Sequence, residues 1–210
     1  MAPVFIFSNQ RTGGTRLADH LSVFFDRVLH EPFNKKRDWF QAYISHQRTG
    51  YLSQEFKEEI LNSNAIIKHC VEVQNNDFNR DLTRFIWGSG IKVIVLRRVI
   101  ERHRIRSLER ALASGRWFPD IHSPGWQNPA SIEELGKKSL ATIRANRQVD
   151  ELLATHEPSL TVKYERLYSK KQSLAVLQEI YSHLEVSVIP NEKITTEFLS
   201  SGRMPSPSSI

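Results

Sequence analysis

Hydrophobic and polar positions follow two different periods along this chain. Short apolar runs rich in β-branched residues are typical of buried strands, and they cover residues 4–8, 65–69, 92–97 and 160–164. Between them, apolar residues recur at helical spacing over 15–25, 53–62, 81–88, 99–114, 131–155 and 170–184. Because strands alternate with helices, we expect a parallel sheet that is covered on both faces. The pattern predicts an α/β fold, a three-layer sandwich with a central parallel β-sheet flanked by helices.

The periodicity stops in two segments. Over residues 115–129, prolines, glycines and tryptophans replace it, and we expect a long loop over the carboxyl edge of the sheet. The Ser/Pro-rich tail, about residues 204–210, is expected to be mobile. No repeat divides the chain, so residues 1–210 are predicted to form a single domain.

Composition and charge narrow the class of protein. The chain has 210 residues, of which 40% are hydrophobic, and this is enough for one core of ordinary size. Its one cysteine, Cys70, excludes an intrachain disulfide and suits a reducing compartment. Polar residues interrupt the first apolar run, unlike in a signal peptide, and the longest later run, 93–96, is too short to cross a bilayer. We expect a soluble, cytoplasmic protein whose net charge of +6 attracts anions.

A glycine-bearing turn lies between the first predicted strand and the first predicted helix. It reads Asn9-Gln10-Arg11-Thr12-Gly13-Gly14-Thr15. At such a turn, unpaired backbone N–H groups and the positive end of the helix dipole can hold an oxyanion. Thr15 can cap the helix, and Arg11 adds a forked, permanently charged donor. The turn suits a phosphate or a sulfate, and the alternative is an ordinary strand-to-helix turn. The lysine of the ATP-binding pattern GxxxxGK[ST] is missing, which disfavours phosphoryl transfer.

This turn resembles a loop of the sulfotransferases that use 3′-phosphoadenosine 5′-phosphosulfate (PAPS). In that family a [KR]-[ST]-G-[ST]-[ST] loop follows the first strand and binds the 5′-phosphosulfate. Two positions depart from the pattern: Gly14 replaces a usual Ser or Thr, and Arg16 stands where an apolar or aromatic residue is usual. The resemblance implies that Arg11 also stabilises charge on the sulfuryl group. It implies cofactor contacts from Arg11, Thr12, Gly13, Gly14, Thr15 and Arg16.

A second match lies in the stretch KVIVLRRVIERHRIRSLERA, residues 92–111. In the same family a strand ends in an arginine, and a serine about two helical turns later helps to hold the 3′-phosphate. Arg98 and Ser107 have the spacing of the bacterial trehalose-type branch. The other arginines of this helix are expected to form a solvated face, namely Arg102, Arg104, Arg106 and Arg110.

Two residues are candidates for the general base. The stretch LHEPFN places Glu31 where carbohydrate sulfotransferases have a glutamate that in some members takes the proton of the acceptor hydroxyl. AIIKHC resembles the second central strand of the family, in which a lysine or histidine faces the active site. Adjacent strand residues point to opposite faces, so we expect one of Lys68 and His69 to do so. His69 is the rival base, and its alternative is a hydrogen-bonded core histidine.

Two further matches lie toward the C-terminus. TVKYERLY resembles the late VRYEDL strand of the family, which implies a structural role for Tyr164 and Glu165. Family members often place a basic, glycine-containing loop on the cofactor near this end, and Arg203 is the corresponding candidate here.

Together, the matches resemble a PAPS-dependent sulfotransferase of the bacterial trehalose-type or carbohydrate branch, with a fold like that of P-loop nucleotide hydrolases. The resemblance implies metal-free transfer of a sulfuryl group from PAPS to a hydroxyl acceptor, with adenosine 3′,5′-bisphosphate as product. A sugar acceptor is preferred narrowly over a lipid or a tyrosine, because some aromatic side chains could stack on sugar rings. Core packing or a dimer interface explains these aromatics equally well, and they are Trp39, Tyr43, Trp117 and Trp126.

Two alternatives stay open. A P-loop kinase-like, ATP-dependent phosphotransferase would bind ATP with magnesium. A non-enzymatic polyanion or nucleic-acid binder would use the arginine-rich helix, with a steep salt dependence. Few aromatics flank that helix, so we expect no nucleic acid partner. The sequence carries no signal for an oligomeric state.

Overall fold

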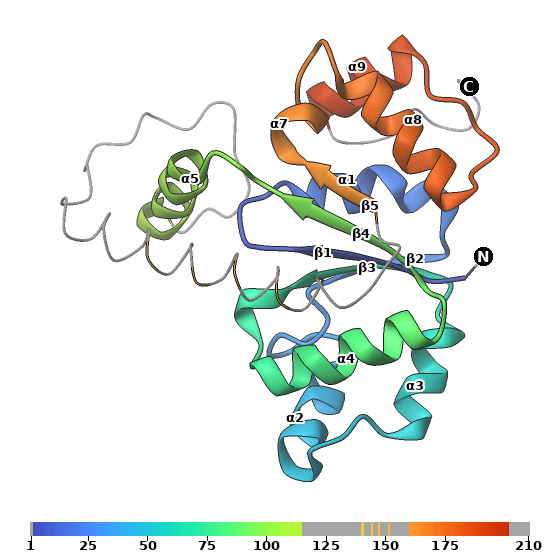
Figure 1. Cartoon of the computed structure of the whole chain (residues 1–210), viewed down its shortest axis with the longest axis vertical. Helices are drawn as coiled ribbons and strands as arrows, with labels where there is room; N and C mark the ends of the chain where they lie inside the picture. Colours follow the sequence, from blue (N-terminus) through green and yellow to red (C-terminus); the bar gives the residue numbers. More distant parts are fainter. Residues whose placement is uncertain are drawn as a thin grey trace.

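The computed structural model describes residues 2–114 and 160–201, together with Leu140, Arg144, Arg147 and Glu151. Helices enclose a central sheet from both sides (Figure 1). The predicted loop 115–129, most of the predicted helix 131–155, Arg203 and the tail 204–210 lie outside the described residues.

The central sheet has five strands in the described part of the chain, and every neighbouring pair is parallel. The strands are β1 (Val4–Ser8), β2 (Arg27–His30), β3 (Ala65–Cys70), β4 (Lys92–Arg97) and β5 (Leu160–Lys163). Their order across the sheet is β2-β3-β1-β4-β5. This arrangement confirms the predicted α/β sandwich with a parallel sheet. The edge strand β2 was not predicted.

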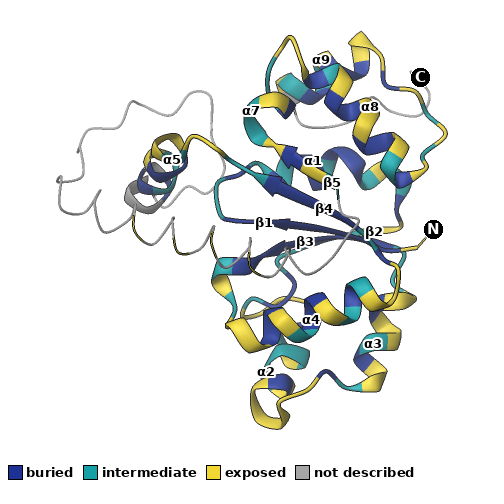
Figure 2. Cartoon of the chain, in the orientation of Figure 1, coloured by how far each residue is buried: buried dark blue, intermediate teal, exposed yellow. Residues whose placement is uncertain are grey.

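Residue alternation divides the core between the two faces of the sheet. Val4 and Ile6 of β1 pack on one face, against α1 (Gly14–Leu21), α8 (Ser173–Leu184) and α9 (Glu192–Ser201). Phe5 and Phe7 pack on the other face, against α2 (Phe40–Thr49), α3 (Gln54–Leu61) and α4 (Asn76–Gly88). The central strands are therefore buried on both sides, as Figure 2 shows. Burial on both sides explains their uninterrupted apolar sequences.

Most predicted helices are present, with shifted ends. Helix α1 begins at Gly14, and its predicted end is a short 3₁₀ segment, Ser22–Phe24. Helix α4 begins before residue 81 because Asn75 caps it, accepting a hydrogen bond from the Phe78 N–H. Helix α5 spans Glu101–Ser114. Helix α2, the four-residue α7 (Tyr164–Leu167) and α9 were not predicted, and Tyr164 begins a helix where a strand was expected.

The strand order reverses at β1. The chain passes from β1 to the β2 and β3 side of the sheet and then returns to β4 on the other side of β1. Open parallel sheets bind ligands at such a point, outside the carboxyl ends of the strands. The turn after Ser8 lies there, and the register places Ser8 level with Cys70 and Leu96. The described helices include none with the length and apolar character that a bilayer span requires.

Candidate anion-binding site at the carboxyl edge of the sheet

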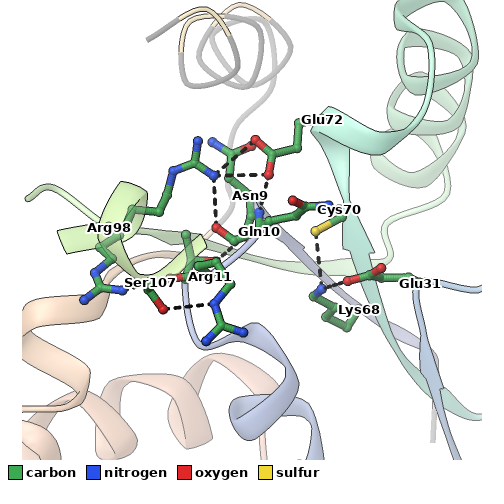
Figure 3. A network of polar contacts seen from close by, with 11 residues as sticks. Asn9, Gln10, Arg11, Glu31, Lys68, Cys70, Glu72, Arg98 and Ser107 are labelled. Carbon is green, nitrogen blue, oxygen red and sulfur yellow. Dashed lines mark hydrogen bonds and ion pairs between the residues drawn. The ribbon is translucent and has the colours of Figure 1, made fainter. Parts of the chain in front are cut away.

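A largely buried ion pair, Glu72 with Arg104, holds the backbone of the turn after β1. The Gln10 N–H donates to Glu72 Oε1 at 2.7 Å, and Arg104 Nη1 donates to the Gln10 carbonyl at 3.0 Å. The same Arg104 nitrogen contacts both oxygens of Glu72, at 3.1 and 3.2 Å. Glu72 follows β3 and Arg104 lies on α5, so three segments meet at the Gln10 peptide, where Figure 3 shows Gln10 beside Glu72.

Arg104 corrects the prediction of a solvated arginine face. Its side chain is only 3% exposed, whereas Arg102 and Arg106 are exposed as predicted. The helix turns Arg104 and Ile105 inward, and both are buried. The side chain of Arg110 lies outside the described residues. Neither Glu72 nor Arg104 was a predicted site residue.

Hydrogen bonds link Arg11 to both Arg98 and Ser107 at the end of this turn. Arg11 Nε donates to Ser107 Oγ at 2.9 Å, and Arg98 Nη1 donates to the Arg11 carbonyl at 3.0 Å. Arg11 adopts a left-handed backbone conformation with φ 61°. Burial lowers the pKa of Arg11, and the positive charge of Arg98 lowers it further. Two positively charged guanidinium groups thus lie close together, and a bound anion would reduce the repulsion between them.

The start of α7 supports Arg98 and the segment that follows it. The Arg98 guanidinium lies over the Tyr164 ring, 4.2 Å from its centroid. The Glu165 carboxylate accepts hydrogen bonds from the N–H groups of Val99 and Ile100, at 3.1 and 2.8 Å, just before α5. Burial raises the pKa of Glu165, but these hydrogen bonds outweigh it, and the net pKa is lowered. These contacts fit the structural role predicted for Tyr164 and Glu165.

Tyr168, at the end of α7, supports the glycine turn itself. Its hydroxyl donates to the Gly13 carbonyl at 2.7 Å, and its ring stacks on Phe198 with centroids 5.2 Å apart. Gly13 has φ 80°, and a Cβ there would come within 2.6 Å of the Tyr168 ring. Position 13 therefore requires glycine on two grounds, its backbone conformation and the lack of space.

Gly14 begins α1 and is packed from both sides. A Cβ there would lie 2.9 Å from Ser8 Oγ and 3.2 Å from Lys68 Cε. A serine or threonine, usual in the resembled family, would crowd the Lys68 chain. The Ser8 hydroxyl beside it is buried and has no hydrogen-bond partner among the described residues.

The first turn of α1 offers backbone donors. Its first helical bond runs from the Leu17 N–H to the Gly13 carbonyl, at 3.1 Å, so the N–H groups of residues 14–16 have no acceptor within the helix. The predicted cap by Thr15 is wrong, because Gly13 is the N-cap and no side chain caps the helix.

Thr12 is buried, and its hydroxyl donates to the Asn9 carbonyl at 2.6 Å. Arg16 reaches toward α9, where Nη1 lies 3.4 Å from the Leu199 carbonyl.

Glu31 lies near this turn and forms an ion pair with Lys68 (Figure 3). Lys68 Nζ bonds Glu31 Oε1 and lies 3.3 Å from Cys70 Sγ, while Asn34 Nδ2 donates to Glu31 Oε2 at 2.7 Å. Burial raises the pKa of Glu31, but the charge and hydrogen bond of Lys68 outweigh it, and the net pKa lies below the ordinary value. The carboxylate stays ionised and is partly exposed. Glu31 also has a left-handed backbone, with φ 50°.

His69 points to the opposite face from Lys68 and is 1% exposed. It bonds Asn79 Oδ1 at 2.7 Å and packs edge-on against Phe7 and Phe33. Burial lowers its pKa to about 4. His69 is therefore a hydrogen-bonded core histidine, which was the alternative to a general base. An acceptor cannot reach a ring that is buried in this way.

Trp39 and Tyr43 are two of the aromatic side chains that could stack on a sugar. Both pack on the core, which was the alternative explanation for them. Trp39 is buried among Phe33 and Phe56, and its Nε1 donates to Glu59 Oε1 at 2.6 Å. Tyr43 packs on the Phe78 ring with centroids 5.1 Å apart. Trp117 and Trp126 lie outside the described residues.

Comparisons with known proteins bear on the fold. Neither a protein-family model nor a curated protein matches the sequence. The structure is similar to the sulfotransferase domain from the curacin biosynthetic pathway, with a TM-score of 0.50 and 20% identity, over 91% of this chain and 76% of that domain. It also matches shikimate kinase from Bacteroides thetaiotaomicron, with a TM-score of 0.45 and 14% identity, over 88% of this chain and 98% of the kinase. The likeness to the sulfotransferase domain supports the predicted α/β fold.

Proposed function

We propose that this protein is a sulfotransferase that transfers a sulfuryl group from PAPS to a hydroxyl group of an acceptor. The observation that carries the proposal is the convergence of Arg11, Arg98 and Ser107 at the N-terminal end of α1. Arg11 lies between the other two, since its Nε donates to Ser107 Oγ and its carbonyl accepts from Arg98 Nη1, and this arrangement supports the proposal.

The residues present fit a bisphosphorylated nucleotide. Arg11 and Arg98 supply two permanent charges, and the first turn of α1 supplies backbone donors and the positive end of its dipole. The buried Ser8 hydroxyl is a further donor that lacks a partner in the described residues. When bound, PAPS supplies the sulfuryl group and the adenosine bisphosphate leaving group.

Each contact residue takes one role in the proposal. Arg98 and Ser107 bind the 3′-phosphate, and Arg11 with the N–H groups at Gly14 and Thr15 binds the 5′ end. In the structure Arg11 Nε donates to Ser107 Oγ, so the two groups of contacts in this proposal adjoin each other. Contacts from Thr12, Arg16 and Arg203 to the cofactor stay predictions from the sequence.

Glu31 is the proposed general base. It accepts the proton of the acceptor hydroxyl at a carboxylate oxygen, while the hydroxyl oxygen forms its bond to sulfur and the bond to the 5′-phosphate breaks. Arg11 stabilises the charge that develops on the leaving oxygen. Lys68 keeps Glu31 ionised and orients one carboxylate oxygen, and Asn34 orients the other. We leave His69 out of the site because its ring is buried in the core on the other face.

Calorimetric titration tests the proposal with two ligands that differ by one phosphate. Adenosine 3′,5′-bisphosphate should bind at least tenfold more tightly than adenosine 5′-monophosphate, and Arg98→Ala and Ser107→Ala should remove most of the difference. Absence of bisphosphate binding at millimolar concentration would falsify it. Tighter binding of Mg-ATP than of the bisphosphate would favour the phosphotransferase alternative.

A further inference from the structure

The loop that follows β2 carries the proposed base and is firmly placed. We call residues 31–38 the acceptor loop. Phe33 within it and Trp39 directly after it are buried in the core. Two turns shape it, since the Asn34 N–H donates to the Glu31 carbonyl and the Arg37 N–H donates to the Asn34 carbonyl, both at 3.0 Å. The backbone between these anchors therefore follows a defined course after Glu31.

Both acids of the acceptor loop are paired with cations from strands of the sheet. Glu31 pairs with Lys68 of β3, and Asp38 pairs with Arg27 of β2 at 3.1 Å. The loop's own cations are different. Lys35, Lys36 and Arg37 are consecutive and exposed, and within residues 2–114 and 160–201 none of them has an acidic partner.

In the chain, these three charges directly follow the residue that bonds the proposed base. Lys35 directly follows Asn34, whose side chain donates to Glu31. Lys36 has φ 67°, an uncommon conformation for a residue other than glycine. Three adjacent like charges repel one another, and a bound anion would remove that repulsion.

The position of β2 separates these cations from the nucleotide site. Strand β3 lies between β2 and β1, so the acceptor loop starts two strand spacings, about 10 Å, from the turn that binds the nucleotide in our proposal. The nucleotide already has Arg11 and Arg98 at its own end of the site. An anion bound at Lys35–Arg37 would therefore lie at the Glu31 end of the site and not at the nucleotide end.

We propose that the acceptor is anionic, a hydroxyl compound that carries a carboxylate, sulfate or phosphate group close to the reacting hydroxyl. The inference rests on the proposed function. Lys35 and Lys36 act as point charges that attract the acceptor, and the Arg37 guanidinium can bind a planar carboxylate through two hydrogen bonds.

The test uses acceptor pairs that differ in charge. One pair is 4-nitrophenyl β-glucuronide and 4-nitrophenyl β-glucoside, and the other is a blocked Glu-Tyr-Glu peptide and a blocked Gly-Tyr-Gly peptide. Transfer from radiolabelled PAPS gives kcat/KM for each. We expect the acidic member of at least one pair to be used about tenfold better, equivalent to ~1.4 kcal/mol, and the preference to fall at high salt.

A matched pair of variants locates the effect. Lys35→Gln with Lys36→Gln should remove most of the preference, while Lys170→Gln with Lys171→Gln, an equal change of charge between α7 and α8, should leave it intact. Equal use of both members in both pairs, or transfer to none of the four, would overturn the inference. Failure of the bisphosphate to bind would instead overturn the proposed function, so the two failures are distinguishable.

Discussion

Arg11 Nε donates to Ser107 Oγ at 2.9 Å, although the two residues are 96 positions apart in the chain. The contact ties the turn after β1 to the second turn of α5. Arg11 makes it from a left-handed backbone conformation, φ 61°, that residues with a Cβ rarely adopt. Such conformations persist when surrounding contacts fix them, and they are frequent at functional sites.

The backbone of Arg11 is expected to store strain. Arg11→Gly and Arg11→Ala both remove the guanidinium, but only glycine relieves the left-handed conformation. The glycine variant should therefore be more stable than the alanine variant by about 1 kcal/mol, measured by urea unfolding. Both variants should lose bisphosphate affinity to a similar extent. An alanine variant as stable as the glycine variant would show that the backbone is unstrained.

Replacement of Arg98 by lysine should weaken nucleotide binding. Lysine keeps the charge but cannot bond the Arg11 carbonyl and a phosphate through one planar fork. We expect the affinity for adenosine 3′,5′-bisphosphate to fall about tenfold, or ~1.4 kcal/mol, in calorimetry. Arg102→Lys, an exposed position on α5, is the control and should bind normally. Normal binding by both variants would mean that the positive charge at position 98 is sufficient and the guanidinium shape is not needed.

The Glu72–Arg104 pair should contribute strongly to stability. Glu72→Gln or Arg104→Gln removes one member of this largely buried pair and should cost about 3 kcal/mol in the free energy of unfolding. The double variant should cost less than the sum, because the two side chains interact directly. In contrast, Arg27→Gln breaks an exposed pair with Asp38 and should cost under ~1 kcal/mol.

Loss of the ion pair should also affect the turn it supports. If the pair fixes the Gln10 peptide, Glu72→Gln should lower bisphosphate affinity at temperatures where the variant is still folded. Arg11→Ala should then cost less affinity in the Glu72→Gln background than in the unmodified protein. If the losses of affinity from Arg11→Ala and Glu72→Gln were additive, the Glu72–Arg104 pair would have a structural role only.

His69 should make stability depend on pH. Its pKa is about 4 in the folded protein, against an ordinary 6.5, so below pH 6.5 the unfolded chain binds a proton that the folded chain does not. Stability should fall as the pH falls from 6.5 to 4, by about 3 kcal/mol from this residue. Unfolding of the protein and of His69→Gln at pH 7, 5.5 and 4.5 measures the difference. Parallel pH profiles of the two proteins would contradict this assignment.

The acid limb of the pH–rate profile should report Glu31. Its pKa is lowered, so kcat/KM should hold on acidification until the pH falls below the ordinary range of a glutamate. Lys68→Met removes the cation that lowers this pKa and should move the acid limb to higher pH. Glu31→Gln should lower kcat by about 10²–10⁴-fold, as expected for loss of a general base. An unmoved limb in Lys68→Met would assign the titration to another group.

The central strands could be predicted because burial on both faces leaves an uninterrupted apolar run. β2 could not, because it lies at the edge and only Leu29 of its four residues is buried. Helix α7 has four residues, too few to show a helical period. The long apolar runs therefore predicted the central strands of the sheet. The short elements β2 and α7 could be identified only from the structure.

The candidate site was predicted in part. Arg11, Arg98 and Ser107 were predicted from the resemblance; Arg11 contacts each of the other two, and their role stays a prediction. Arg104 was missed because a cluster of arginines does not reveal which member turns inward. Its position three residues before Ser107 was an available signal, since residues at i and i+3 share a helix face. Glu72, two residues after the end of β3, was a second signal.

Tyr168 and Gly13 are 155 residues apart, and their hydrogen bond has a consequence for the order of folding. During synthesis the glycine turn emerges among the first residues, but its support from α7 exists only after β5 has joined the sheet. Contacts between such distant residues form late, because a long loop must close first. The turn should therefore reach its final shape at the end of folding, and nascent chains that stop before α7 should bind the nucleotide weakly.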